Sequence, residues 1–324
     1  MQAIQRIALL TSGGDAPGMN AAIRAIVRSS SAQGITTVGV RKGFAGLSSG
    51  NFEELTDRQV GGILQHGGTM LGSMRHVAFR DEATQLQALH HLRQQDIDGL
   101  IVIGGNGSQQ GSLALHRLGF PVVGIASTID NDLAETETSI GVDTALNTAM
   151  AYIDRLKDTA TSHHRAFIVE LMGRDSGYLA VMTAIATGAE SVVVPEFDTP
   201  PEEIIEDVIH AYERGKAYYI AIVAEGAKLK APYLAQYLDT HPGSFEARLG
   251  VLGHVQRGGS PTVRDRVLAS ELGVAAVVQL TEGHTGVVIG WVNSQPTPIA
   301  FERAIAPCHK VTRELLQMVK LLSR

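Results

Sequence analysis

Short runs of apolar, β-branched residues alternate along the chain with longer segments of helical pattern, and this alternation is what most limits the possible folds. The predicted strands are residues 6–11, 36–41, 99–105, 121–127, 165–171, 191–196, 218–226, 249–255 and 286–292. The predicted helices include residues 19–31, 82–95, 108–118, 143–159, 178–187 and one that begins near Pro201. Strands that are apolar on both faces need helices on both sides of a parallel sheet. The sequence therefore predicts an α/β protein with mostly parallel sheets.

Length and composition narrow the class further. A chain of 324 residues is long enough for two domains of ordinary size. The formal net charge of −6 and the lack of long Lys/Arg runs argue against nucleic acid or an anionic membrane as a partner. The single cysteine, Cys308, cannot form an internal disulfide, which is typical of a reducing compartment. No apolar stretch approaches the ~20 residues that span a bilayer. We therefore expect a cytoplasmic protein.

Polar, glycine-rich segments follow the predicted strands immediately. They read SGGDAPG, GGNGS, STIDND, MGRDSG, AEG and HVQRGGSP. In open parallel sheets ligands bind outside the carboxyl ends of the strands, so these loops predict one ligand-binding cleft. The loops at 12–18 and 104–108 each lead into a helix and are candidate phosphate sites, because backbone N–H groups at a helix N-terminus favour an anion. Neither matches the G-x-x-x-x-G-K-[ST] or G-x-G-x-x-G pattern, and a plain tight turn is the alternative for each.

Two carboxylates, Asp130 and Asp132, flank an asparagine directly after the predicted strand 121–127. One can take a proton from a hydroxyl group while the other reaches a metal, directly or through water. An Asx turn with solvated acids is the alternative interpretation of the same residues.

Several arginines lie in the polar loops or beside the predicted strands. Arg174 and Arg257 lie at the ends of predicted strands, and Arg165 and Arg248 lie just before strands. Arg75 lies in the segment GTMLGSMRH. Each alone reads as an ordinary surface arginine, but several that converge on one cleft indicate phosphate recognition, because a guanidinium group donates paired hydrogen bonds. Glu225 and His254 lie in similar loops and are candidate contacts for a sugar or a phosphate. A capping acid and a packing histidine are the alternatives for these two.

The segments TSGGDAPGMNAAIR, GGTMLGSMR, IGGNGS, TIDND, MGRDSG and LGHVQRGGSPTVRDRVLAS occur in this order over essentially the whole chain. Together they resemble the bacterial-type, ATP-dependent 6-phosphofructokinases. The resemblance implies two Rossmann-like three-layer αβα domains with the active-site cleft between them. It also implies transfer of the ATP γ-phosphoryl group to the 1-hydroxyl of fructose 6-phosphate, with Mg²⁺ as cofactor. Members of the family are typically homotetramers whose active sites borrow residues from a neighbouring subunit.

The resemblance also implies a role for individual residues. It makes Asp130 the general base and Arg174 the group that stabilises the transition state, with Thr128 and Asp132 in the same catalytic set. The implied nucleotide contacts are Gly14, Arg75, His76, Gly105, Asn106, Gly107 and Ser108. The implied sugar-phosphate contacts are Thr128, Asp130, Arg165, Met172, Gly173, Arg174, Glu225, Arg248, His254 and Arg257, with Arg165 and Arg248 acting on the adjacent subunit. The implied metal contacts are Asn106 and Asp132, and an effector site is implied at Arg24, Arg28, Lys157, Glu190, Arg214 and Lys216.

Three positions depart from the family pattern. Asn106 stands where an aspartate that helps to bind Mg²⁺ is usual, so we expect the metal to enter with the nucleotide phosphates and to be supported by Asp132. Gly107 and Ser127 lack the acid and the lysine typical of relatives that use pyrophosphate, which favours ATP. Asp57 stands where the effector site normally has a phosphate-binding arginine, and Gly62 replaces an acid. We therefore expect weak activation by conventional effectors.

The expected domains are residues 1–140 with 255–305, which would bind nucleotide, and residues 141–254 with 306–324, which would bind sugar phosphate. Two alternatives to the ATP-dependent kinase are considered. The first is a pyrophosphate-dependent phosphofructokinase. The second is a catalytically silent paralogue that binds sugar phosphate, a reading invited by Asn106 and opposed by Asp130 and Arg174.

Overall fold

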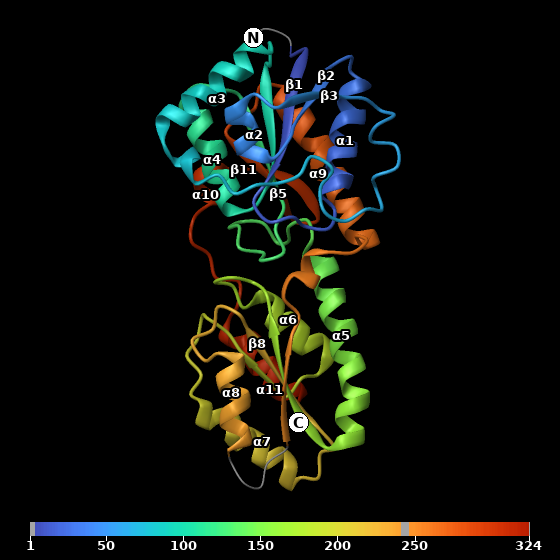
Figure 1. Cartoon of the computed structure of the whole chain (residues 1–324), viewed down its shortest axis with the longest axis vertical. Helices are drawn as coiled ribbons and strands as arrows, with labels where there is room; N and C mark the ends of the chain where they lie inside the picture. Colours follow the sequence, from blue (N-terminus) through green and yellow to red (C-terminus); the bar gives the residue numbers. More distant parts are fainter. Residues whose placement is uncertain (1–3, 241–245, 324) are drawn as a thin grey trace. The chain divides into compact units, whose positions relative to one another are not determined.

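The computed structural model describes residues 4–240 and 246–323, and the chain divides into two compact units. Unit 1 comprises Met1–Thr144 and Arg257–Cys308, and unit 2 comprises Ala145–Gln256 and His309–Arg324. Figure 1 colours both along the sequence. The chain passes from one unit to the other a few residues beyond each expected boundary. Helix α5 (Val142–His163) starts in unit 1 and continues through unit 2.

Unit 1 is built on a seven-stranded sheet with the order β11-β10-β5-β4-β1-β2-β3. Its strands are β1 (Arg6–Ser12), β2 (Thr36–Val40), β3 (Phe52–Leu55), β4 (Gly99–Gly104), β5 (Val122–Ala126), β10 (Val287–Val292) and β11 (Gln295–Ala300). The inner strands pair in parallel, whereas β3 and β11 add to the two edges in antiparallel orientation. The prediction of a mostly parallel sheet is confirmed.

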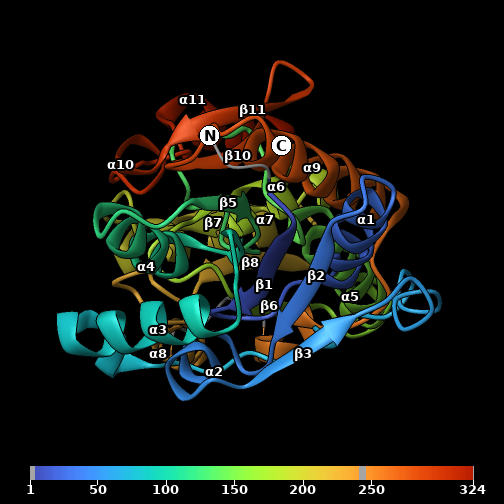
Figure 2. The same cartoon turned by 90° about the horizontal axis from the view of Figure 1, so that it is seen from above.

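Helices cover both faces of this sheet, as Figure 2 shows from above. One face carries α1 (Met19–Ser31) and α9 (Val263–Thr281), which pack against each other. The other face carries α2 (Gly43–Ser49), α3 (Glu82–Gln94) and α4 (Asn106–Arg117), preceded by the short 3-10 helix η1 (Val77–Arg80). Ala8 and Leu10 of β1 point into the core beneath α2–α4, and Phe301 of α10 (Phe301–Ala304) closes the same core. The alternate residues Ile7 and Leu9 are equally buried, which is why this strand is apolar throughout.

Unit 2 contains a four-stranded, entirely parallel sheet with the order β7-β8-β6-β9. Its strands are β6 (Arg165–Leu171), β7 (Ser191–Val193), β8 (Tyr219–Ala224) and β9 (Glu246–Val251). Helices α7 (Pro201–Glu213) and α8 (Ala231–Asp239) cover one face, while α5, α6 (Tyr178–Thr187) and α11 (Arg313–Leu322) cover the other. Each sheet is therefore the centre of three layers.

Some predicted boundaries are wrong, and the reasons are local. The strand expected at 249–255 is instead β9, which ends at Val251 and is followed by the 3-10 helix η2 (Gly253–Arg257). Gly253 has φ +54°, and this left-handed turn stops the strand. The edge strand β11 was missed because Pro296 and Pro298 argue against a strand, although proline is tolerated at an edge. The edge strand β3 was missed as well. Helix α4 begins at Asn106, two residues earlier than expected.

The polar loops keep their predicted place at strand ends. Three of them follow β1, β4 and β5, which are neighbours in the sheet of unit 1. The other three follow β6, β8 and β9, which are neighbours in the sheet of unit 2. Each unit therefore gathers a set of candidate functional loops at the carboxyl edge of its own sheet.

Candidate active site

The loops after β1, β4 and β5 lie against one another in unit 1. The backbone N–H of Ser127 donates to the carbonyl of Gly104 at 3.2 Å. A methyl group added at Gly105 would lie 3.1 Å from Cβ of Thr128, and one added at Gly13 would lie 3.1 Å from Oγ of Ser108. Glycine at these positions lets the three loops approach closely, so the residues that they carry share one small region.

The first turn of α4 is part of this region and contains no acidic residue. An N-terminal helix turn with free N–H groups favours an anion. A methyl group added at Gly107 would meet no atom of the described residues within 4 Å, so the helix start faces open space at that point. Nδ2 of Asn106 donates to the carbonyl of Ile305 at 3.2 Å, and its Oδ1 accepts a hydrogen bond from Gln110 at 2.7 Å.

The loop that carries Asp130 is tightly held. The backbone N–H of Asp130 donates to Oγ1 of Thr128 at 3.1 Å, and Oγ of Ser139 donates to the Thr128 carbonyl at 2.6 Å. Asn131 adopts the left-handed conformation with φ +50°, and its side chain donates to the carbonyl of Glu137. Asp130 is only 4% exposed, so the alternative of a solvated acid is wrong for this residue. A buried carboxylate in a fixed loop is suited to accept a proton from a bound hydroxyl.

Arg257 reaches two of the loops. Its Nη1 donates to the carbonyl of Asp15 at 3.2 Å, and its Nη2 lies 4.0 Å from Oδ1 of Asp130. A methyl group at Gly14 would lie 2.2 Å from Nη1, so this close approach requires glycine. Arg257 thus joins the loop after β1 to the loop after β5 with a cation.

Two further predicted contacts of unit 1, Arg75 and His76, lie between β3 and α3, and a third, Asp132, follows β5. Oγ of Ser73 donates to the carbonyl of Gly13 at 2.5 Å, which ties the segment before Arg75 to the loop after β1. Arg75 itself is exposed. The ring of His76 lies 6.4 Å from that of Phe79. Asp132 is partly buried, and its carbonyl accepts a hydrogen bond from the Cys308 thiol.

In unit 2 the loop after β6 is organised by Glu225, which follows β8. One carboxylate oxygen of Glu225 accepts hydrogen bonds from the backbone N–H groups of Gly173 and Arg174, at 3.2 and 2.8 Å. Gly173 has φ +149° and Arg174 has φ +52°, so the turn is unusual for ordinary residues. Gln256 accepts from the backbone N–H of Met172 at 2.8 Å. The side chains of Glu225 and of buried Gln256 therefore fix the backbone from which the Arg174 side chain extends.

Arg165 and Arg248, which sequence reasoning paired only by resemblance, lie together on β6 and β9. Glu246 contacts both, with its Oε2 2.8 Å from Nε of Arg165 and its Oε1 against Nη2 of Arg248. The two guanidinium groups lower the pKa of the Glu246 carboxyl below its ordinary value. A cluster of two arginines around one exposed carboxylate resembles a phosphate site in which an acid occupies the anion position. His254 lies in η2, shortly after β9 in the sequence, and its side chain is exposed.

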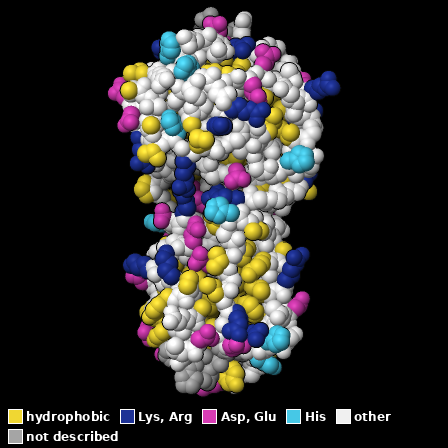
Figure 3. All heavy atoms as spheres, in the orientation of Figure 1, with side chains coloured by type: hydrophobic (Ala, Val, Ile, Leu, Met, Phe, Trp, Pro, Cys, Tyr) yellow, Lys and Arg dark blue, Asp and Glu magenta, His cyan; other side chains and the backbone are white. Residues whose placement is uncertain are grey.

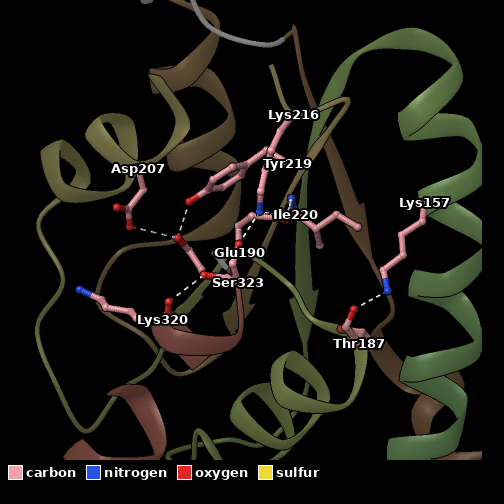
Figure 4. A network of polar contacts seen from close by, with 10 residues as sticks. Lys157, Thr187, Glu190, Asp207, Lys216, Tyr219, Ile220, Lys320 and Ser323 are labelled. Carbon is pink, nitrogen blue, oxygen red and sulfur yellow. Dashed lines mark hydrogen bonds and ion pairs between the residues drawn. The ribbon is translucent and has the colours of Figure 1, made fainter. Parts of the chain in front are cut away.

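The residues of the implied effector site separate into two groups. Arg24 and Arg28 belong to α1 of unit 1, whereas Lys157, Glu190, Arg214 and Lys216 belong to unit 2. Figure 4 shows the unit 2 network: Lys216 lies 3.1 Å from Oε1 of Glu190 and also contacts the Ser323 carbonyl, and Lys157 contacts the Thr187 carbonyl.

Glu190 is the buried member of this network. Burial raises the pKa of its carboxyl, and this outweighs the opposing effects of the Ile220 N–H and Lys216. In unit 1, Asp57 accepts a hydrogen bond from Ser31 at 2.9 Å, which places an acid beside the end of α1.

Four supporting residues were not singled out from the sequence. They are Glu196, Gln256, Glu246 and Asp265. Glu196 accepts from the backbone N–H of Gly177, at the start of α6. Gln256 stands inside the quoted HVQRGG segment, and Asp265 follows Thr262, whose side chain caps α9. The position of Glu246 beside Arg165 and Arg248 becomes visible only once β6 and β9 are paired, so the sequence alone offers little sign of it.

Among residues 4–240 and 246–323, no cluster of three or more His, Cys, Asp or Glu side chains could hold a metal ion. A metal held mainly by substrate phosphates and water needs only one or two protein oxygens, so Mg²⁺ does not require such a cluster. No helix in the described part of the chain is both long and apolar enough to cross a membrane.

Loops rich in glycine, arginine and carboxylates at the ends of parallel strands define an α/β protein of the phosphate-handling class. A family model described as phosphofructokinase matches residues 6–280. The chain belongs to the phosphofructokinase family. It is 48% identical over 320 residues to the ATP-dependent 6-phosphofructokinase of Lysinibacillus sphaericus, covering 99% of this chain and 100% of that relative. It is 45% identical to that of Listeria welshimeri, with the same coverage.

Solved structures agree on the fold. The T-state phosphofructokinase of Pichia pastoris matches with a TM-score of 0.89 and 32% identity, over 94% of this chain and 36% of that longer chain. A pyrophosphate-dependent phosphofructokinase from Marinobacter aquaeolei matches with a TM-score of 0.86 and 20% identity, over 98% of this chain and 91% of that chain. At this lower identity the match concerns the fold alone.

Proposed function

We propose that this chain is an ATP-dependent 6-phosphofructokinase of glycolysis, which transfers the γ-phosphoryl group of ATP to the 1-hydroxyl of fructose 6-phosphate. The observation that carries the proposal is the region where the loops after β1, β4 and β5 meet around buried Asp130. The relatives from Lysinibacillus sphaericus and Listeria welshimeri, matched over their full length, carry the same activity in their names.

In this reaction the Asp130 carboxylate takes the proton of the sugar 1-hydroxyl, and the hydroxyl oxygen attacks the γ-phosphorus. The new O–P bond forms as the bond to the β-phosphate bridging oxygen breaks, and ADP leaves. The guanidinium of Arg174 stabilises the negative charge on the transferring group. Thr128 holds the backbone of the Asp130 loop through its hydroxyl. Arg257 keeps a positive charge beside the Asp130 carboxylate, with its Nη2 4.0 Å from Oδ1.

The nucleotide would lie along the loops after β1 and β4. The start of α4 at Asn106 favours phosphate groups. The nucleotide contacts that we propose are Gly14, Arg75, His76, Gly105, Asn106, Gly107 and Ser108. The open space beside Gly107 accommodates a bulky donor, which supports ATP over bare pyrophosphate. Ser127, buried between the strand ends, adds no cation that pyrophosphate would need.

Mg²⁺ would be held by Asp132 and by the carbonyl oxygen of Asn106, together with the nucleotide phosphates. Oδ1 of Asn106 accepts one hydrogen bond, from Gln110, and a carbonyl oxygen can accept two, so this donor set fits a hard cation. When bound, the metal supplies positive charge to the phosphate oxygens. Because Asn106 is neutral, we expect Asn106→Asp to lower the Mg²⁺ concentration needed for half-maximal turnover. An unchanged Mg²⁺ dependence would contradict this assignment.

The sugar phosphate would be bound by unit 2. Met172, Gly173, Glu225 and His254 would contact the sugar, and Arg165 with Arg248 would bind its 6-phosphate in the adjacent subunit. This arrangement needs an oligomer, and we propose a homotetramer.

Exposed apolar surface supports such assembly. Figure 3 shows hydrophobic side chains gathered on one face of unit 2. The exposed large hydrophobic residues of this unit include Leu249 and Val251 of the edge strand β9, and α9 exposes a stripe with Val263, Val267, Val274 and Val278. A cytoplasmic location, expected from the single cysteine, completes the proposal.

One assay tests the activity. The purified chain, offered fructose 6-phosphate with ATP or with pyrophosphate, should turn over with ATP only. Activity with pyrophosphate alone would favour a pyrophosphate-dependent phosphofructokinase. No activity with either donor would favour a catalytically silent paralogue.

A second assay tests the shared sites. Neither Asp130→Asn nor Arg248→Ala subunits alone should be active, but co-refolded mixtures should regain part of the activity, because some shared sites then receive both native residues. Mixtures as inactive as their parents would contradict the sharing of sites between subunits.

A further inference from the structure

Both ends of the Asn106 side-chain amide are used within unit 1. The amide nitrogen donates to the carbonyl of Ile305 at 3.2 Å, across 199 positions of sequence. The amide oxygen accepts from Gln110, one turn further along α4, at 2.7 Å. The i, i+4 partner therefore orients the amide, and the amide nitrogen joins the first turn of α4 to the segment that follows α10.

The segment 301–308 also contacts the loop that carries the two aspartates. The backbone N–H of Ala134 donates to the carbonyl of Ala304 at 2.9 Å. The thiol of Cys308 lies 3.4 Å from the carbonyl of Asp132. One short stretch of chain thus binds the start of α4 on one side and the residues just after Asp130 on the other.

The bond from Asn106 to Ile305 needs a donor. An asparagine amide supplies two N–H groups, whereas an ionised aspartate of the same shape supplies none and would set a negative oxygen against a carbonyl. Other side chains also join α4 to α10. The ring of His116 lies 6.3 Å from that of Phe301, which belongs to the core beneath α4. Arg117 forms an ion pair with Glu302, and these two side chains are 65% and 57% exposed. An exposed pair of this kind contributes little. His116 lies near the other end of α4, so the Asn106 amide is the hydrogen bond that ties the first turn of α4 to this segment.

We propose that Asn106 is a positioning residue that fixes the start of α4 relative to the Asp130 loop, acting through the segment 301–308. This inference rests on the proposed function, because that function places the nucleotide at the start of α4 and the general base on the Asp130 loop. It assigns to the neutral amide a task that the charged residue usual in the family cannot perform.

Cys308 is the only cysteine of the chain and is partly buried, so a change in its rate of labelling by a thiol reagent reports a change in the packing of this segment in the whole, ligand-free protein. In Asn106→Ala and Asn106→Asp we expect labelling about three- to tenfold faster than in the unaltered protein, the range set by the loss of one net hydrogen bond. Arg117→Gln is the matched control at the same interface, and its labelling should change by less than about twofold.

Kinetic measurements distinguish a residue that positions the site from one that only stabilises the fold. At saturating Mg²⁺, Asn106→Ala should lower kcat several-fold and leave KM for fructose 6-phosphate unchanged, because the proposed sugar contacts lie elsewhere in the chain. Circular dichroism confirms that the variants are folded. If an Asn106 variant does not fold, hydrogen exchange at the Ala134 amide in Gln110→Ala, which disturbs only the orientation of Asn106, gives the same test by faster exchange.

The proposal is supported if both Asn106 variants are labelled faster, if kcat falls in Asn106→Ala, and if the labelling rate of Arg117→Gln stays nearly unchanged. Labelling at the unaltered rate, a kcat that does not change, an equal response of Arg117→Gln, or unchanged Ala134 exchange in the fallback variant overturns it. Failure of the proposed function would appear separately, as a lack of phosphofructokinase activity in the unaltered protein, and the labelling rates would still decide whether the connection exists.

Discussion

Nη2 of Arg257 lies 4.0 Å from Oδ1 of Asp130, and the two side chains are 14% and 5% exposed. The pair places a guanidinium cation beside the buried carboxylate that we propose as the general base. The same arginine also donates to the Asp15 carbonyl, so one side chain contacts both Asp130 and the loop after β1.

Asp130→Asn keeps the shape of the side chain but cannot take up the hydroxyl proton. We expect kcat to fall by about 10²–10⁴-fold, the usual contribution of a general base, with KM for both substrates changed by only a few fold. Steady-state kinetics measure this. Asp96→Asn, an exposed residue with φ +52° that asparagine tolerates, is the control and should be fully active. A kcat for Asp130→Asn within tenfold of the unaltered protein would show that another group is the base.

Gly226 is required by the turn that carries Arg174. A methyl group there would lie 1.9 Å from the carbonyl oxygen of Arg174, and a backbone atom cannot move aside without disturbing the turn. We expect Gly226→Ala to lower kcat at least tenfold and to cost about 1–3 kcal/mol of stability, as overpacking does. Kinetics and urea denaturation check the two effects. Gly62→Ala, where the added methyl meets no atom of the described chain within 4 Å, should change neither.

Glu246 neutralises the two arginines proposed to bind the sugar phosphate. In Glu246→Gln the phosphate no longer competes with a carboxylate, so KM for fructose 6-phosphate should fall several-fold while kcat changes little. Saturation curves give both constants. Glu206→Gln, on the exposed side of α7, serves as the charge-matched control. A KM that rises in Glu246→Gln would mean that the carboxylate orients the arginines rather than competing with the substrate.

Asp265 is a buried carboxylate that joins α9 to the start of α5. It accepts hydrogen bonds from the backbone N–H groups of Gly141 and Thr144 and from the Thr144 hydroxyl. An amide at this place would set its own N–H₂ group against one of these donors, so Asp265→Asn should lose about 2–3 kcal/mol of stability in urea denaturation. Asp198→Asn, which breaks only the exposed pair with Lys228, should lose less than about 1 kcal/mol. Equal losses in the two variants would refute the role given to Asp265.

The buried Glu190 makes stability depend on pH. Its pKa is raised by burial above the ordinary value of 4.5, despite the N–H of Ile220 and the nearby Lys216. Between the ordinary and the raised value the folded state binds more protons than the unfolded state, so this group lowers stability as pH rises through that window. Glu190→Gln removes the effect.

The stability of Glu190→Gln relative to the unaltered protein should therefore increase from acid to neutral pH, as measured by urea midpoints over that range. Exposed Glu213→Gln should show a flat difference. Parallel curves for Glu190→Gln and the unaltered protein would contradict the raised pKa.

Many of the helices and strands could be predicted from the local spacing of apolar residues. The bounds of α1 and α6 match those predicted, and the apolar runs of β1, β4 and β8 mark strands that are buried on both faces. The residues that lead from these strands into loops could also be found, because glycine, arginine and carboxylates at strand ends break the apolar pattern at once. Edge strands such as β11 escaped, since an edge does not require a continuous apolar run.

The partners of those loop residues could not be read in the same way. Arg257 meets Asp15 across 242 positions and Asn106 meets Ile305 across 199, and nothing in either local segment encodes the other. The sequence by itself determined the α/β class, the elements and the loops that carry polar residues, because periodicity reports which faces are buried. Only the tertiary structure decided which loops touch, because that depends on the order in which strands from distant parts of the chain join one sheet.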